Sequence, residues 1–367
     1  CINPILTFNL ELLTFNSLCL RASVVFLNST LQIKLREDKI MAEAGKDWAF
    51  RGFCLGVPRQ SDMDVFKRLI SEILPSYDCN AFVLLIRYQY QFKSHPTVAD
   101  RNPLSTDQAS EIAELCRKNN IRLIPKMNLL GHQSGKDRGS ELGLLRAYPE
   151  FDETPELASV RYCRSLCPKH PEVKGVVFDL VDEIIDAFQA DAIHVGLDEV
   201  FEIGTCPICK GTPNAELFSD WVNALHSHIS GDRKVEMLMW SDRFLDGNAT
   251  GFGEWEASKN DTWQKIDSVP KDIIMCDWHY GEREDYPSLK IFSDNGFRFI
   301  VGPWRELKAT QAFLNFAGNN KSDQLMGFLQ TSWCDSGAVA RYLCDGDNSV
   351  DEIPRQVGES FKWIMSF

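Results

Sequence analysis

The stretch IHVGLDEV at residues 193–200 is an apolar run that ends in two adjacent carboxylates, Asp198 and Glu199. A short apolar run of this kind is typical of a buried strand. Because burying an unpaired charge is costly, the strand must end where water or a ligand reaches both carboxylates. Neighbouring side chains of a regular strand point to opposite faces, but both can enter one cleft where the pleat breaks.

Two carboxylates held close together move each other's pKa apart. One can then remain protonated as a general acid while the other stays ionised. Asp198 and Glu199 are therefore candidate catalytic residues. The alternative interpretation is a solvated Asp-Glu pair at the start of a loop.

The same pattern repeats along the chain, with short apolar runs alternating with amphipathic stretches as in βαβ units. The expected strands are residues 52–57, 81–88, 121–130, 192–197, 235–240, 273–278, 297–304 and 326–333. The expected helices are residues 62–74, 106–119, 173–190, 215–229, 286–295 and 310–317. Eight strands, most of them followed by a helix, predict a single (β/α)8 TIM barrel. An open doubly wound sheet has a similar alternation, but no Gly-x-Gly-x-x-Gly follows the first strand.

The barrel is expected to cover residues 48–367, with residues 1–47 as an N-terminal extension of uncertain status. These first residues are rich in Leu, Phe and Asn, and a hydrophilic stretch begins after Met41. One hypothesis is that the working protein begins near Met41. The other is that the extension adds strands to the barrel.

The chain of 367 residues has a formal net charge of −13, spread along its length. Such a charge repels phosphate backbones and anionic lipids, so neither nucleic acid nor a membrane surface is expected as a partner. The twelve cysteines are scattered, and several lie in apolar runs where a free buried thiol is the ordinary interpretation. This distribution, without a clear signal peptide, favours a reducing, cytoplasmic compartment.

Polar and aromatic side chains gather where the expected strands end. In a (β/α)8 barrel the catalytic groups sit at the carboxyl ends of the strands. Those ends carry His132, Asp198, Glu199, Trp240, Asp242, Asp277, Trp278, His279, Tyr280, Trp304, Trp333 and Asp335. Paired carboxylates surrounded by Trp are suited to a carbohydrate substrate, because indoles pack against the apolar faces of sugars.

The motif HVGLDEV at residues 194–200 closely resembles the signature of glycoside hydrolase family 20, the β-N-acetylhexosaminidases. The similarity extends over essentially the whole chain from Arg51, as in a short bacterial-type branch of the family. Residues 124–132 (IPKMNLLGH) resemble the family's third-strand motif, and residues 327–335 (GFLQTSWCD) resemble its last-strand Trp-x-Glu.

The resemblance implies a role for each matching position. Glu199 would be the general acid and base, and Asp198 would orient the substrate's acetamido group. Arg51 would hold the sugar O3 and O4 hydroxyls. The further substrate-binding residues would be His132, Trp240, Trp278, Tyr280, Trp333 and Asp335, with Tyr280 or His279 bonded to the acetamido oxygen.

The implied reaction is exo-acting, retaining release of terminal β-linked GlcNAc or GalNAc. The substrate's own acetamido oxygen is the nucleophile, and neither a cofactor nor a metal takes part. Two alternatives stay open: a catalytically silent amino-sugar-binding barrel, and an ordinary two-carboxylate glycosidase with Asp242 or Asp277 as the second carboxylate. From its place in the sequence alone, Asp242 is expected to be a solvated loop carboxylate.

The sequence departs from the family pattern at several positions. Lys126 and Asn128 stand where the family has Glu and Asp, and Asp335 is one methylene shorter than the usual Glu. The second strand carries residues 86–90 (IRYQY) in place of the larger enzymes' His-Trp-His motif. These changes put the choice of substrate in doubt.

Cys206 and Cys209 form a Cys-x-x-Cys pair soon after the carboxylates. Cys163 and Cys167 could supply two further thiolates to a structural zinc. A disulfide is the other interpretation. In either case the expected role is to stabilise the loop that follows the carboxylates, not to take part in catalysis.

Overall fold

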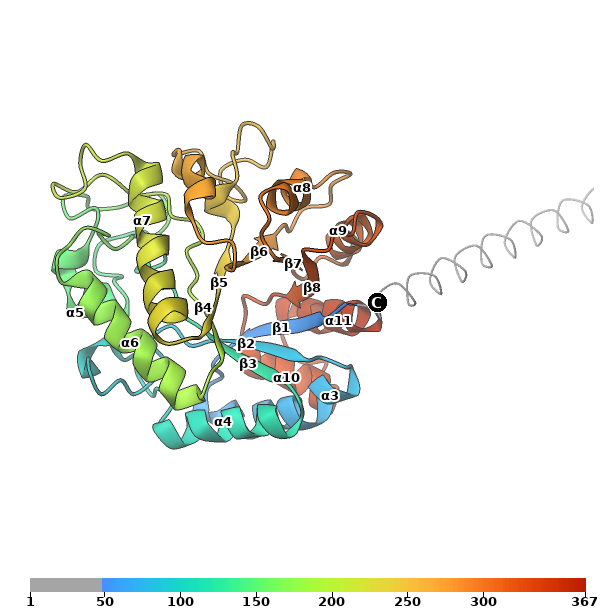
Figure 1. Ribbon diagram of the computed structural model, residues 1–367. Coiled ribbons are helices and arrows are strands. Elements are labelled where there is room, and N and C mark those ends of the chain that lie inside the picture. The colour runs from blue at the N-terminus through green and yellow to red at the C-terminus, as the bar shows by residue number, and fades with distance from the viewer. Residues whose placement is uncertain (1–47) are drawn as a thin grey trace, which may run out of the picture. The chain divides into compact units, whose positions relative to one another are not determined.

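The computed structural model describes residues 48–367, in which eight parallel strands close into a barrel in chain order (Figure 1). The barrel closes where β1 pairs with β8. The strands are β1 (Phe50–Gly56), β2 (Ala81–Leu85), β3 (Arg122–Lys126), β4 (Ala192–His194), β5 (Glu236–Trp240), β6 (Ile274–Trp278), β7 (Phe299–Gly302) and β8 (Leu325–Gln330). All eight predicted strands are confirmed, and the open sheet is excluded. The expectations for residues 1–47 lie outside the described residues.

Helices surround the strands, as Figure 1 shows. They are α2 (Met63–Arg68), α3 (Leu74–Ser76), α4 (Thr106–Lys118), α5 (Gly143–Ala147), α6 (Val173–Phe188), α7 (Asn214–His226), α8 (Pro287–Asp294), α9 (Leu307–Asn319), α10 (Ser336–Asp345) and α11 (Glu352–Ser366). Helices occupy all six predicted ranges. The sequence did not reveal α5, α10 and α11. Gly337 and Pro354 stand in the first turns of α10 and α11, Gly358 lies inside α11, and both residue types have low helix propensity. No helix in the part of the chain that the structure describes is long and apolar enough to cross a membrane.

The seam between β1 and β8 depends on one glycine. Gly327 lies opposite Phe50 with φ of 152°, a conformation that L side chains rarely adopt. A Cβ at this position would collide with the backbone oxygen of Phe50. Glycine is therefore required for the close approach that completes the ring of strands.

Apolar side chains fill the barrel interior below the carboxyl ends of the strands. The buried cluster includes Val83, Ile124, Leu238, Ile274 and Leu329. Cys54 and Cys276 belong to the same cluster, as expected for buried thiols, and burial raises the pKa of Cys54 to about 12. This packed layer fixes the strand ends and hence the side chains that project from them.

Candidate active site

A pocket of about 280 Å³ opens at the carboxyl end of the barrel. Its lining residues are Arg87, Lys126, Asn128, His132, Tyr162, Asp198, Glu199, Trp240, Trp278, Tyr280, Trp304 and Trp333. Seven of the nine predicted catalytic and substrate-binding residues thus lie together, whereas Arg51 and Asp335 do not line the pocket. A larger neighbouring pocket of about 790 Å³ shares Arg87 and Trp333 with it.

The backbone after β4 turns both carboxylates into the pocket. Gly196, Leu197 and Glu199 have positive φ of 73°, 71° and 52°, so the regular alternation of a strand ends here. A Cβ on Gly196 would come within 2.8 Å of Asn128 Oδ1, which leaves no room for a larger residue. Positive φ at a non-glycine residue is unfavourable, and such conformations cluster at active sites.

His132 bridges the two carboxylates. Its Nε2 lies 3.0 Å from Asp198 Oδ2 and 3.2 Å from Glu199 Oε2. Burial disfavours the charged imidazole, but the charges and hydrogen bonds of the two acids outweigh it and raise the pKa of His132 to about 9. A protonated Nε2 is a hydrogen-bond donor to both carboxylates.

The environments of the two acids separate their pKa values. Burial acts to raise the pKa of Asp198, but the charge and hydrogen bond of His132 and the charge of Lys126 lower it below its usual range. Burial and the neighbouring charge of Asp198 raise the pKa of Glu199, against the hydrogen bond from His132. Asp198 is accordingly the ionised partner and Glu199 the residue suited to hold a proton.

Asp242 is a buried structural carboxylate. The sequence favoured a solvated loop position for it, and this prediction was wrong, since only 2% of the residue is exposed. Its Oδ2 accepts from the backbone N–H of Glu199 at 3.0 Å and from Arg243 Nε at 2.7 Å, and its Oδ1 accepts from Trp278 Nε1 at 3.2 Å. Asp242 therefore holds the Glu199 backbone and the Trp278 ring in place, but it does not itself line the pocket.

Aromatic side chains form most of the pocket wall. The Trp240 and Trp333 rings meet edge to face at 6.0 Å, and Tyr280 lies between Trp278 at 4.9 Å and Trp304 at 5.3 Å. Flat apolar surfaces inclined to one another suit a sugar ring and a methyl group.

Tyr280 lines the pocket, whereas His279 does not. The phenol oxygen accepts a 2.8 Å hydrogen bond from Trp333 Nε1, and because indole only donates, the phenol keeps its own hydrogen for another acceptor. His279 is buried, with Nδ1 2.9 Å from Glu256 Oε2 and Nε2 3.2 Å from Asp277 Oδ1. Of the two residues left open by the sequence, the structure thus places only Tyr280 within reach of a ligand.

Lys126 replaces a family carboxylate on the pocket floor. Its Nζ donates to Asn128 Oδ1 at 2.7 Å and lies 5.6 Å and 5.8 Å from the Trp240 and Trp333 ring centres. Burial lowers the pKa of Lys126, and the charge of Asp198 opposes this shift. Lys126 and Asn128, the two residues that depart from the family motif, thus form a hydrogen bond with each other. His132 forms its hydrogen bond directly with Asp198.

Arg51 lies at the other end of the barrel from the pocket, contrary to the expectation that it holds sugar hydroxyls. It is near the start of β1, and its guanidinium donates to the backbone oxygens of Asp78 and Met365. Arg87, just after β2, is the arginine that lines the pocket. The strand position of residues 86–90 was the signal that could have identified it.

Asp335 caps a helix instead of lining the pocket. Its Oδ1 accepts from the backbone N–H groups of Gly337 and Ala338 at 2.9 and 3.2 Å, at the start of α10. Its other oxygen lies 3.3 Å from Arg59 Nη2. The shorter side chain is therefore engaged with the backbone, which contradicts the expected contact with sugar hydroxyls.

Tyr162 is a pocket residue that the sequence did not single out. It lies on the long loop after β3, with its ring 5.6 Å from His132 and 5.1 Å from Trp255. Trp255 belongs to the other long loop, residues 244–270, so these two loops meet beside the pocket.

An eight-stranded parallel barrel with two carboxyl groups of separated pKa and an aromatic pocket at its carboxyl end is an arrangement suited to a glycoside hydrolase. Residues 85–335 match the model of the glycosyl hydrolase family 20 catalytic domain. The chain belongs to this family, and thus to the β-N-acetylhexosaminidase-like glycoside hydrolases.

The chain is similar to Hexosaminidase D of Bos taurus, with 23% identity over 296 residues that cover 72% of this chain and 79% of the relative. Among solved structures it is similar to Flavobacterium johnsoniae chitobiase, with 19% identity, a TM-score of 0.62, and coverage of 87% of this chain and 52% of that one. It is also similar to the exo β-N-acetylglucosaminidase from Vibrio harveyi in complex with N-acetylglucosamine, with 16% identity, a TM-score of 0.60, and coverage of 86% and 54%. The chain spans about half the length of these two structures, and at this identity the likeness concerns the fold.

We expect His279 to make folding stability fall at alkaline pH. Burial disfavours its charged form, but Asp277 and Glu256 outweigh burial and raise its pKa from 6.5 to about 9. A raised pKa contributes stability that is fully present below pH 6.5 and is lost as the pH rises through about 9.

Urea unfolding of wild type and His279→Gln over this pH range tests the prediction. The free-energy difference between the two proteins should shrink as the pH rises, while His132 titrates in both. A difference that stays constant with pH would contradict a protonated His279.

Proposed function

We propose that the protein releases terminal β-linked N-acetylhexosamine by substrate-assisted, retaining hydrolysis. The observation that carries this proposal is the pair Asp198 and Glu199, the only carboxylates among the described residues that line the pocket. A two-carboxylate glycosidase needs a second carboxylate across the sugar, about 5–9 Å from the acid. Asp242 and Asp277 are both buried in other hydrogen bonds, which favours a nucleophile supplied by the substrate.

In the first step Glu199 donates its proton to the glycosidic oxygen while the acetamido oxygen attacks C1. The bond to the leaving group breaks, and a cyclic oxazolinium forms on the same sugar. Asp198 accepts a hydrogen bond from the acetamido N–H and faces the positive charge that develops on the substrate. The phenol of Tyr280 donates a hydrogen bond to the acetamido oxygen. Glu199, now ionised, then removes a proton from water as the water attacks C1. The C1–O bond of the oxazolinium breaks and restores the acetamido group, and this second inversion gives net retention.

The hydrogen bonds of Asp198 suit its proposed role of binding the acetamido group. Asp198 Oδ2 is bound by His132, whereas Oδ1 is buried and has no hydrogen-bond partner among the residues described. A buried acceptor without a partner is costly, and a substrate N–H would satisfy it. The pocket volume of about 280 Å³ is at the small end for ligand sites, which suits a single terminal sugar. The neighbouring larger pocket would take the rest of the glycan.

The proposal is tested by hydrolysis of aryl β-GlcNAc, aryl β-GalNAc and aryl β-glucoside. Turnover of the acetamido sugars alone, with the β-anomer of the free sugar as first product, is the expected result. Comparable turnover of the glucoside would point to an ordinary two-carboxylate enzyme. Binding of the acetamido sugars without any turnover would point to the silent barrel.

We expect Arg87 to contribute substrate binding in place of Arg51. A charged hydrogen bond is worth about 1.5–3 kcal/mol, so Arg87→Ala should lower kcat/KM by roughly 10–150-fold, mainly through KM. Arg51→Lys is the matched control and should leave both constants near wild type, because its guanidinium bonds backbone oxygens far from the pocket. A loss of kcat/KM in the Arg51 variant alone would contradict this assignment.

A further inference from the structure

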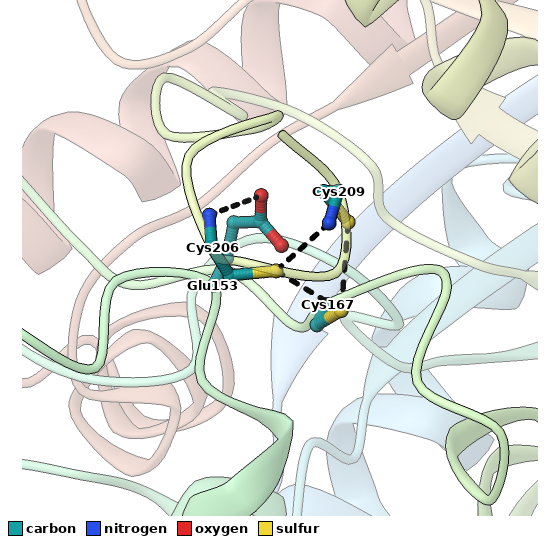
Figure 2. A group of neighbouring side chains, drawn as sticks. All are labelled: Glu153, Cys167, Cys206 and Cys209. Carbon is teal, nitrogen blue, oxygen red and sulfur yellow. Dashed lines mark hydrogen bonds between the residues drawn. The ribbon is translucent and has the colours of Figure 1, made fainter. Parts of the chain in front are cut away.

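A cluster of three thiols and one carboxylate lies outside the pocket. Its members are Glu153, Cys167, Cys206 and Cys209, all buried, and one ligand atom from each lies within 4.8 Å of all the others. Figure 2 shows the four side chains converging from two loops. Cys163, which the sequence had suggested as a member, instead accepts a hydrogen bond from the backbone of His132.

The sulfur positions fit a shared ligand better than a disulfide. Cys167 Sγ is 3.4 Å from Cys206 Sγ and 3.5 Å from Cys209 Sγ, so it is nearly equidistant from both. A disulfide would join only one of these pairs, at about 2.05 Å, and leave the third thiol alone. Tetrahedral zinc with Zn–S bonds of about 2.3 Å separates its sulfurs by about 3.8 Å, which is close to the arrangement found.

Glu153 provides an independent indication of a cation. The residue is fully buried, and its Oε1 accepts from the backbone N–H groups of Thr205 and Cys206 at 2.8 and 3.3 Å. Its Oε2 is also buried but has no hydrogen-bond partner in residues 48–367. An ionised carboxylate in such a position is costly unless it is paired or coordinates a metal. The two backbone bonds also fix the direction in which the free oxygen points.

The turn at residues 206–211 (CPICKG) places two sulfurs on one side. Cys206 O accepts from the N–H groups of Cys209 and Lys210 at 3.2 and 2.9 Å, and the Cys209 N–H also lies 3.3 Å from Cys206 Sγ. Gly211 closes the turn with φ of 89°, a conformation that favours glycine. The sulfurs are therefore preorganised before the other loop contributes Glu153 and Cys167.

We propose that Glu153, Cys167, Cys206 and Cys209 bind a structural zinc ion. Thiolate and carboxylate oxygen are both zinc ligands, and four protein ligands leave no open position for catalysis. The ion joins the loop after β3, which carries His132, to the segment after β4, which carries Glu199. Zinc therefore stabilises the loops that frame the acid pair, and this role does not depend on which glycoside is cleaved.

Metal analysis of the full chain, purified without chelator, is the first test, and one zinc per chain is expected. Cobalt exchanged into the site should show the thiolate-to-metal absorption of a tetrahedral centre. A chain without zinc would overturn the proposal, whether its thiols are all free or peptide mapping finds Cys167 in a disulfide. This result is obtained on wild type and needs no variant to fold.

Variants then locate the ion. Cys206→Ser and Glu153→Gln should each weaken zinc binding at least about tenfold, because each removes one ligand and leaves the others in place. Cys344→Ser is the control, since this thiol lies in α10 outside the cluster. Chelation should lower the melting temperature of wild type and of the control alike. Zinc retained unchanged in Cys206→Ser would overturn the assignment of these ligands.

Discussion

Replacing Glu199 with Gln is expected to reduce kcat on aryl β-N-acetylhexosaminides by about 10²–10⁴-fold, the range ascribed to a positioned general acid. The amide keeps the shape of the side chain but has no proton to transfer to the leaving oxygen. Steady-state kinetics with wild type and variant measures the effect. Glu202→Gln is the control, because Glu202 is only three positions further along the chain but does not line the pocket.

Two further readouts separate acid catalysis from a structural effect of Glu199→Gln. The defect should be smaller for aryl groups that leave readily without protonation, such as dinitrophenyl, than for poor leaving groups. Wild-type kcat/KM should fall at high pH as Glu199, whose pKa burial and Asp198 raise, loses its proton. That alkaline limb should be lost in the variant. An equal defect for every leaving group, with the pH profile unchanged, would contradict the assigned role.

The barrel could be predicted because each strand is a local pattern. Runs such as residues 273–278 are apolar throughout, as parallel strands covered on both faces must be, and turn or helix signals separate them. Six of the eight predicted strands nevertheless extended past the observed carboxyl ends, for example to Leu197 where β4 ends at His194. Those extra residues form the irregular ends that carry the site.

The error over Arg51 has the same physical origin. A motif identifies a residue but not the end of the strand on which it lies, and the two ends of a barrel are far apart. Arg51 is the second residue of β1, so its side chain lies at the end opposite the pocket. Arg87 follows β2 and reaches the pocket, and its position just after a predicted strand was the signal that could have identified it.

Contacts between residues far apart in the chain also could not be predicted from the sequence. Asp242 was expected in solvent, but it is buried because the Glu199 backbone, Arg243 and Trp278 satisfy its oxygens. In the same way, the sequence indicated that Cys206 and Cys209 stabilise a loop, but it did not show that the buried Glu153 lies beside them. A carboxylate in a loop is predicted to be exposed unless the hydrogen-bond donors that stabilise it in a buried position are known.

Replacing Asp198 with Asn is expected to reduce kcat/KM on acetamido sugars by about 10²–10³-fold, as for loss of one preorganised electrostatic contact. The amide is nearly the same size, so the pocket keeps its shape, but the negative charge facing the oxazolinium is lost. His132 also loses the negative charge of the nearer of its two partners, whose Oδ2 lies 3.0 Å from Nε2. Because this charge matters most when positive charge develops on the substrate, we expect the loss mainly in kcat.

Asp335→Asn is the matched control for Asp198→Asn. The same chemical change occurs at a residue that caps α10 and contacts Arg59 but does not line the pocket, and Asn is as good an N-cap as Asp. The control should keep wild-type kcat and KM. If Asp198→Asn lost affinity but kept kcat, Asp198 would be a binding residue alone, and the acetamido group would not be the nucleophile that this carboxylate orients. Loss of kcat on the acetamido sugars, with the control unchanged, is the result that substrate-assisted catalysis requires.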